Sequence, residues 1–184
     1  MKITAIFAVE EFTLYSVAYD NQEMEFSRLF NLWINDFEYL FDFFQENSSD
    51  LNSSFYGAIS IEDAVRRTRK QAIEFRRKFY QLIEKQQNSN LKLQAIFRPL
   101  HNSDYQLKEL LREKSKVDWL RIYAIRISEN TYVVSGGSIK LTQTMNTRPH
   151  LQLELKKLDM TRQYLIENGL TDESDYGFIE FKEE

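Results

Sequence analysis

The sequence of 184 residues predicts a single α+β domain with a mainly antiparallel sheet, two long helices ahead of it and a closing helix behind it. Two stretches, 119–127 and 131–141, combine aromatic and β-branched residues around a short polar turn, which is typical of a strand hairpin. Apolar residues recur at steps of three and four over 25–46 and 61–86, which predicts two amphipathic helices. The resulting order of elements favours a sheet with its helices on one side.

The chain opens with two predicted strands, 3–9 and 12–19, which are rich in β-branched and aromatic residues. Glu10 and Glu11 mark the corner between them. Together the two strands predict a hairpin at the N-terminus.

The first predicted helix, 25–46, carries a heavy aromatic stripe. Its members are Phe26, Leu29, Phe30, Trp33, Phe37, Leu40, Phe41 and Phe44. Such a stripe is far more often a core or a partner groove than a cofactor site. We expect Phe37 to be buried, so that its truncation to Ala would destabilise the protein by roughly 3–5 kcal/mol.

The second predicted helix, 61–86, follows Ser60 as its cap. Its polar face is the densest basic run of the chain: Arg66, Arg67, Arg69, Lys70, Arg76, Arg77 and Lys78. One interpretation is a polyanion-binding face. The other, which we favour, is that this face is solvated or pairs with the acidic side chains of the first helix, such as Asp36, Glu38 and Asp42, in a helical hairpin.

The remaining elements complete the predicted sheet. A strand over 91–98 stops at Pro99, and a short helix covers 103–114. After the hairpin, where Gly136 and Gly137 are expected to let the backbone bend, a last helix begins at Pro149. Gly169 ends this helix, and 176–181 predicts an edge strand. The chain is thus read as 1–90 (strands and helical hairpin), 91–168 (sheet and closing helix) and an acidic tail, 169–184.

Charge is strongly segregated along the chain, although the net charge is only −4. Residues 1–63 hold 2 basic and 12 acidic side chains, and residues 64–168 hold 21 basic and 10 acidic ones. A polyanion-binding middle, partly masked by its own acidic ends, explains this pattern. Complementary packing of neighbouring elements explains it equally well.

Several classes of function are disfavoured by what the sequence lacks. It contains no cysteine, so disulfides, thiolate chemistry and cysteine zinc sites are excluded. It has no glycine-rich phosphate loop, and neither histidine belongs to a metal-binding motif, so we expect no metal or other cofactor. Neither a signal peptide nor a membrane span is predicted, which places the protein in the cytoplasm.

Two further expectations concern the last helix. His150 stands at its positive end, which lowers the pKa of the imidazole and makes it a candidate general acid or base. It is more often only a polar helix-start residue. Glu154 and Asp159 are read as surface charges.

The run from Gly137 through Lys140 to Gln143 resembles the end of the central sheet in RelE/ParE-superfamily toxins, closest to the HigB-like branch. The strand 120–125 is similar to that family's arginine- and tyrosine-containing strand. Lys140, Thr142 and Gln143 match its basic Thr-Gln stretch, and Leu141 stands where the family has a second lysine. The resemblance covers about residues 91–168 and implies a RelE-like fold.

The resemblance implies the toxin of a type II toxin–antitoxin system, a metal-independent mRNA endoribonuclease often acting on the ribosome. Its implied partner is an antitoxin, expected to be a helix-turn-helix protein. The candidate catalytic residues are Lys140, Arg121 and Arg126 for phosphorane charge, and Tyr123 or His150 for proton transfer or base stacking. Thr142, Gln143 and Arg148 join Lys140 as candidate RNA-binding residues.

Strand alternation places Arg121 and Tyr123 on one face and Arg126 on the other. The competing hypothesis is a non-catalytic binding protein, phage-derived or accessory, which uses the aromatic helix and the segregated charges as a partner surface.

Overall fold

The computed structural model describes most of the chain: residues 1–9, 12–20, 22–53, 56–84, 97–99, 118–128, 131–142, 145, 147–169 and 175–179. The predicted helix over 103–114 and most of the predicted strand over 91–98 lie outside these residues.

A six-stranded sheet forms the centre of the molecule, in the order β1-β2-β5-β4-β6-β3. The strands are β1 (Lys2–Val9), β2 (Phe12–Ala18), β3 (Phe97–Pro99), β4 (Leu120–Ser128), β5 (Thr131–Ile139) and β6 (Asp175–Ile179). Neighbouring strands are antiparallel except for β2 and β5, which are parallel. The predicted hairpin β4–β5 and the N-terminal pair β1–β2 are both confirmed.

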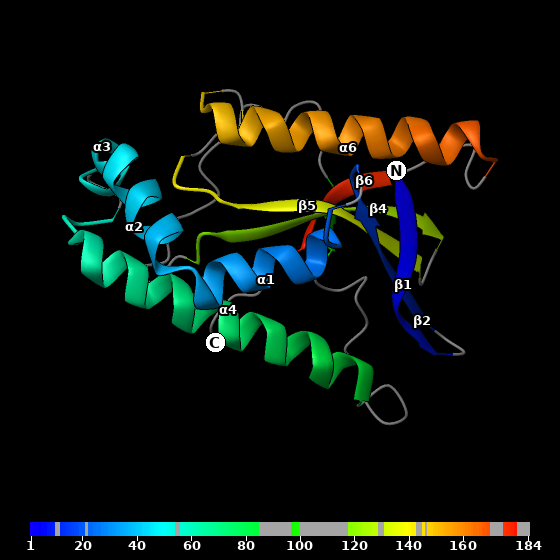
Figure 1. Cartoon of the computed structure of the whole chain (residues 1–184), viewed down its shortest axis with the longest axis horizontal. Helices are drawn as coiled ribbons and strands as arrows, with labels where there is room; N and C mark the ends of the chain where they lie inside the picture. Colours follow the sequence, from blue (N-terminus) through cyan, green and yellow to red (C-terminus); the bar gives the residue numbers. More distant parts are fainter. Residues whose placement is uncertain are drawn as a thin grey trace.

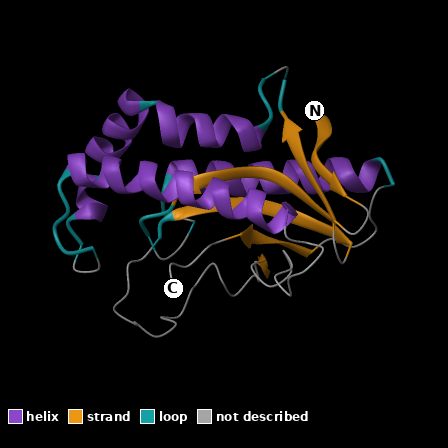
Figure 2. Ribbon diagram, turned by 90° about the horizontal axis from the view of Figure 1, so that it is seen from below, coloured by secondary structure: helices purple, strands orange, loops and turns teal. Residues whose placement is uncertain are grey.

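Helices lie on both faces of this sheet, which corrects the prediction of helices on one side (Figure 1). They are α1 (Glu25–Asn35), α2 (Phe37–Glu46), α3 (Ser48–Leu51), α4 (Ile61–Glu84) and α6 (Pro149–Glu167). One hydrophobic cluster joins α1, α2 and α4 to the sheet, and a second joins α6 to the other face. The view from below shows helices in front of the central strands (Figure 2).

The sequence of β4 explains why both faces are covered. Ile122 and Ala124 point into the first cluster, whereas Tyr123 and Ile125 point into the second. Since a strand that is apolar on both faces must be buried on both, one layer of helices could not satisfy it. The alternation of side chains along β4 therefore already indicated that helices cover both faces of the sheet.

The predicted first helix is broken at Asp36. This residue has an extended backbone, and its carboxylate accepts a hydrogen bond from the Tyr39 amide at 2.9 Å, so it caps α2. The break changes which side chains of the aromatic stripe face the core. Leu40 and Phe44 are fully buried, but Phe37 is 53% and Phe41 43% exposed. The expectation of a buried Phe37 was wrong.

The predicted C-terminal edge strand is an internal strand. β6 pairs with β4 on one side and with β3 on the other, so β3 rather than β6 forms this edge of the sheet. Pro99, which lacks a backbone N–H, is well suited to such an edge.

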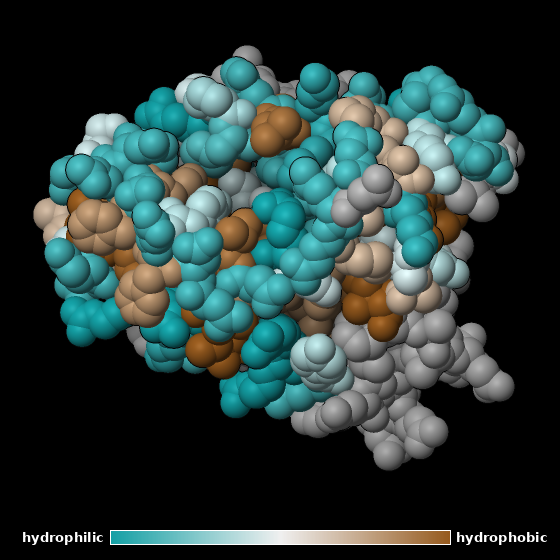
Figure 3. Space-filling view, viewed as in Figure 1, coloured by the Kyte–Doolittle hydropathy of each residue, from teal (hydrophilic) through white to brown (hydrophobic). Residues whose placement is uncertain are grey.

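At Arg69, the basic helix α4 contacts α1 and α2 through a main-chain carbonyl and an aromatic ring, not through carboxylates. The Arg69 guanidinium lies 4.3 Å from the centre of the Phe37 ring, and its Nε donates to the carbonyl of Ile34 at 2.7 Å. The surface in Figure 3 is mostly hydrophilic, with hydrophobic side chains in scattered places.

Candidate functional site

The start of β4 and the end of β5 bring two of the predicted site residues together. The amide of Lys140 donates to the carbonyl of Trp119 at 2.8 Å, and Arg121 pairs with Ser138 in the register of the hairpin. Lys140 and Arg121 therefore lie at the same end of the sheet, two positions apart across neighbouring strands.

Trp119 is the buried centre of this end of the sheet, with no exposed surface. Its Nε1 donates to the hydroxyl of Thr68 at 2.9 Å, which ties it to α4. One residue earlier on α4, the guanidinium of Arg67 lies 4.6 Å from the centre of the indole ring. The ring of Tyr56 lies 5.6 Å from the same indole. The basic face of α4 thus contributes a cation here.

Tyr56 is surrounded by charges from three elements. Its hydroxyl lies 3.5 Å from the carbonyl of Lys140. Burial raises the pKa of Tyr56 to about 12, and the positive charges of Arg121 and Arg67 act against that rise. We call Tyr56, Arg67, Trp119, Arg121 and Lys140 the strand-end cluster.

The guanidinium of Arg121 is oriented by the main chain. Its Nη1 donates to the carbonyls of Asp118 and Leu120, each at 2.9 Å. These bonds turn the side chain back toward the start of β4, where Lys140 also lies. Rigid cations beside aromatic rings are suited to binding phosphate and stacking a base.

The start of α6 meets the same end of the sheet. The Nε2 of His150 lies 3.2 Å from the carbonyl of Ile139, which can only accept, so the ring donates through Nε2 in this contact. The ring also packs edge-on against Phe43, with centroids 5.0 Å apart. Burial lowers the pKa of His150, in the predicted direction, but the main cause is burial rather than the helix end.

Arg148 is held by an acidic residue that the sequence did not single out. Its guanidinium binds both oxygens of Asp50, with Nε 2.7 Å from Oδ2. Asp50 belongs to α3, so this pair joins the short helix to the residue that precedes α6. The predicted RNA-binding Arg148 has a carboxylate partner in this structure.

Four predicted site residues, Lys140, Arg121, His150 and Arg148, are thus gathered at one end of the sheet. Thr142 follows closely and is half-buried, and Gln143 lies outside the described residues.

The other two predicted catalytic residues are elsewhere. Tyr123 is 1% exposed beneath α6, and burial raises the pKa of its phenol. Arg126 pairs with Tyr132 near the opposite end of β4, about 16 Å along the strand from Arg121. Tyr56, Arg67 and Asp50 were not predicted as site residues, because only the tertiary fold brings them to this end of the sheet.

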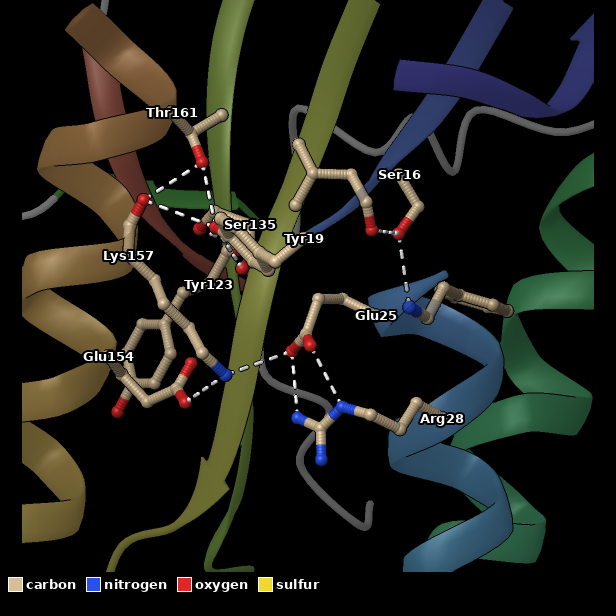
Figure 4. Close-up of polar contacts among 11 residues, drawn as sticks. Ser16, Tyr19, Glu25, Arg28, Tyr123, Ser135, Glu154, Lys157 and Thr161 are labelled. Atoms are coloured by element: carbon tan, nitrogen blue, oxygen red, sulfur yellow. Dashed lines mark hydrogen bonds and ion pairs between the residues drawn. The ribbon is translucent and has the colours of Figure 1, made fainter. Parts of the chain in front are cut away.

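A second group of charged side chains is buried between α1 and α6 (Figure 4). Glu25 is 1% exposed and binds Arg28 through two contacts of 2.8 Å. The ammonium of Lys157 lies 3.1 Å from Glu25 and 2.8 Å from Glu154. Glu154 is 4% exposed, so reading it as a surface charge was wrong.

Gly136 provides the space for this group. A Cβ at this position would lie 2.0 Å from Oε2 of Glu154 and 3.3 Å from Cδ of Lys157. A Cβ on Gly137 would lie 2.7 Å from a methyl carbon of Leu29 on the other face. The two glycines lie within β5, and they let α6 and α1 approach the strand from opposite sides. They were expected to let the backbone bend, but their role here is to leave space for these helices.

Burial is the main cause that raises the pKa of Glu154 to about 7, and Lys157 opposes it. A hydroxyl network continues from this group along α6. Tyr19 donates to the carbonyl of Ser135 at 2.8 Å and shares a hydrogen bond of 2.9 Å with Thr161. The Lys157–Glu25 ion pair joins α6 to α1, and the Tyr19 contacts join the segment after β2 to β5 and α6. Both sets of contacts lie apart from the strand-end cluster.

Comparison with protein-family models, curated proteins and solved structures gives no match for this chain. In the described part of the chain, no helix is both long and apolar enough to cross a membrane. Among the same residues, no three His, Asp or Glu side chains gather into a set that could hold a metal ion.

Proposed function

We propose that this protein binds RNA through the strand-end cluster and acts as the toxin of a type II toxin–antitoxin pair. The observation that carries the proposal is that Arg67, Arg121 and Lys140, from three separate segments, lie at one end of the sheet beside Trp119 and Tyr56. Such a set supplies positive charge for phosphates, and the half-buried Tyr56 supplies a ring for a base. The resemblance of 137–143 to RelE/ParE toxins supports the same proposal.

In this proposal the cluster stabilises the pentacoordinate phosphorane that forms when a ribose 2′-hydroxyl attacks the adjacent phosphate. The bond to the 5′-oxygen then breaks, which leaves a 2′,3′-cyclic phosphate and a 5′-hydroxyl. Arg121 and Lys140 bind its equatorial oxygens, because preorganised cations stabilise charge that develops in a transition state. His150, close to the same strand end, is the candidate that takes the proton from the 2′-hydroxyl and returns one to the leaving 5′-oxygen. The proposed partners are mRNA, either free or on the ribosome, and an antitoxin, and the proposed location is the cytoplasm.

The test is induced expression in a bacterial host, with growth and global translation as the readouts. Wild-type protein should arrest growth and cleave RNA. Arg121→Ala and Lys140→Ala should each relieve the arrest and slow cleavage by about 100- to 1,000-fold, while thermal melting shows that they still fold. Lys156→Ala, an exposed lysine on α6, is the matched control and should behave like wild type.

The second candidate is RNA binding without cleavage, and two observations favour it. Tyr123 is buried away from the cluster, and the His150 Nε2 is engaged by a main-chain carbonyl. If purified protein binds RNA in a salt-dependent way but leaves it intact with and without ribosomes, the binding function stands and the toxin proposal is wrong.

A further inference from the structure

The contact between Asp50 and Arg148 has the geometry of a guanidinium bound to a phosphate. Both oxygens of the carboxylate face the planar fork formed by Nε and Nη2 of Arg148. Arginine binds carboxylate and phosphate through this same fork, since both present two oxygens in one plane. A carboxylate in this position therefore occupies the donors that an RNA phosphate would use.

The carboxylate also lies among the groups of the proposed RNA site. Arg148 is two residues before His150, which contacts Ile139 beside Lys140. The negative charge of Asp50 acts on both Tyr56 and His150. Through Arg148, Asp50 thus lies at the same end of the sheet as the strand-end cluster, whose charged members are all cations.

The side chain of Arg148 is more exposed to solvent than that of Asp50. The Asp50 side chain is 10% exposed, whereas the Arg148 side chain is 34% exposed. The guanidinium can therefore be reached from solvent while its partner is largely covered. Asp50 belongs to the acidic N-terminal third of the chain and Arg148 to the basic middle, so this contact is one place where the segregated charges meet.

We propose that Asp50 is an internal stand-in for an RNA phosphate, which holds Arg148 in the free protein and is displaced when RNA binds. The inference rests on the proposed binding of RNA at the strand-end cluster. Binding then requires the Asp50–Arg148 contact to be broken. The free energy needed to break it makes RNA binding weaker. Asp50 acts as an autoinhibitory residue that weakens binding.

A purely structural ion pair predicts the opposite result, because loss of its acid would loosen α3 from α6 and disturb the site. Two other contacts hold the same region: the Phe43 ring packs on His150, and Tyr56 reaches the Lys140 carbonyl. The region should therefore stay docked when Asp50 loses its charge.

The experiment measures binding of a fluorescently labelled single-stranded 12-nucleotide RNA by anisotropy over a series of salt concentrations. Asp50→Asn keeps the size of the side chain and removes its charge. We expect this variant to bind about fivefold more tightly at low salt, with a salt dependence steeper by about 0.7 in log–log slope, as one added phosphate contact requires. The double variant Asp50→Asn/Arg148→Gln should lose both gains.

The matched control is Asp63→Asn, which removes the partner of Arg66 at the exposed start of α4 and should leave affinity almost unchanged. In the wild-type chain, the Arg148 Nε–H resonance should shift when RNA is added. This measurement does not depend on the folding of any variant.

Weaker or unchanged binding by Asp50→Asn, or an Arg148 resonance that does not respond to RNA, would overturn the inference. If binding still depends on Arg121 and Lys140, the proposed function survives that result. If wild-type protein does not bind RNA at all, both the proposed function and the inference fail.

Discussion

Lys157 crosses the face of β5 at Gly136 and places its ammonium 3.1 Å from the carboxylate of Glu25 (Figure 4). The two residues belong to α6 and α1, which pack on opposite faces of the sheet. Because β2 pairs with β5 only up to Val134, side chains from the two helices can meet beyond that point. The contact fastens both helical layers to each other as well as to the sheet.

The first prediction tests the space at Gly136. Gly136→Ala should destabilise the protein by about 1–3 kcal/mol, because the new methyl group would lie 2.0 Å from a Glu154 oxygen. Chemical denaturation measures the change. In a Glu154→Ala background the same substitution should cost clearly less, since the clashing carboxylate is gone. Equal costs in both backgrounds would show that Gly136 is required for another reason.

The second prediction concerns pH. Burial raises the pKa of Glu154 to about 7, from a value near 4.5 for an exposed group. The folded state therefore holds a proton that the unfolded state has already lost, so stability falls as pH rises from ~4.5 to ~7. The loss attributable to Glu154 is on the order of 3 kcal/mol.

The groups that face Glu154 are Lys157 on α6, Glu25 and Arg28 on α1, and the phenols of Tyr19 and Tyr123. Glu154→Gln mimics the protonated form. We expect it to match the wild type near pH 4.5 and to be more stable above pH 7, as measured by denaturation at each pH. If the two curves stay parallel, Glu154 is already ionised in the folded protein at low pH.

The third prediction uses the break at Asp36. Phe44 is fully buried, so Phe44→Ala should destabilise the protein by roughly 3–5 kcal/mol. Phe37 is 53% exposed and contacts Arg69, so Phe37→Ala should cost less than about 1 kcal/mol. Comparable losses in thermal or urea unfolding would mean that Phe37 is covered in solution.

The hairpin β4–β5 could be predicted because its pattern is local: strand alternation and a polar turn fix which residues pair, and so bring Arg121 close to Lys140. The break at Asp36 could not, because apolar residues continue across it at helical spacing, from Trp33 through Phe37 to Leu40. One capping hydrogen bond, from the Tyr39 amide, decides against a continuous helix.

The rest of the site depends on contacts between segments far apart in the chain. Arg67 was visible within a basic run, but its position over Trp119 follows from how α4 packs on the sheet. Asp50 stands in a polar loop sequence with no motif, and only the fold brings it to Arg148. Likewise, Glu154 looked like a surface charge because its burial depends on a glycine in another element.

The last prediction separates the buried tyrosine from the catalytic role that the sequence suggested for it. The hydroxyl of Tyr123 is buried and has no hydrogen-bond partner among the described residues. Since an unsatisfied buried hydroxyl is unfavourable, Tyr123→Phe should leave stability unchanged or raise it by about 1 kcal/mol. It should also leave growth arrest and RNA cleavage at the wild-type level, because the side chain lies beneath α6.

Tyr19→Phe is the comparison, since it removes a hydroxyl that bonds Ser135 and Thr161 and should destabilise by about 1 kcal/mol. Both variants are measured by thermal unfolding and in the expression assay. A Tyr123→Phe protein that folds normally but no longer cleaves RNA would restore Tyr123 as a catalytic group. It would also require α6 to move away from β4 during the reaction, because only then could the phenol reach a substrate.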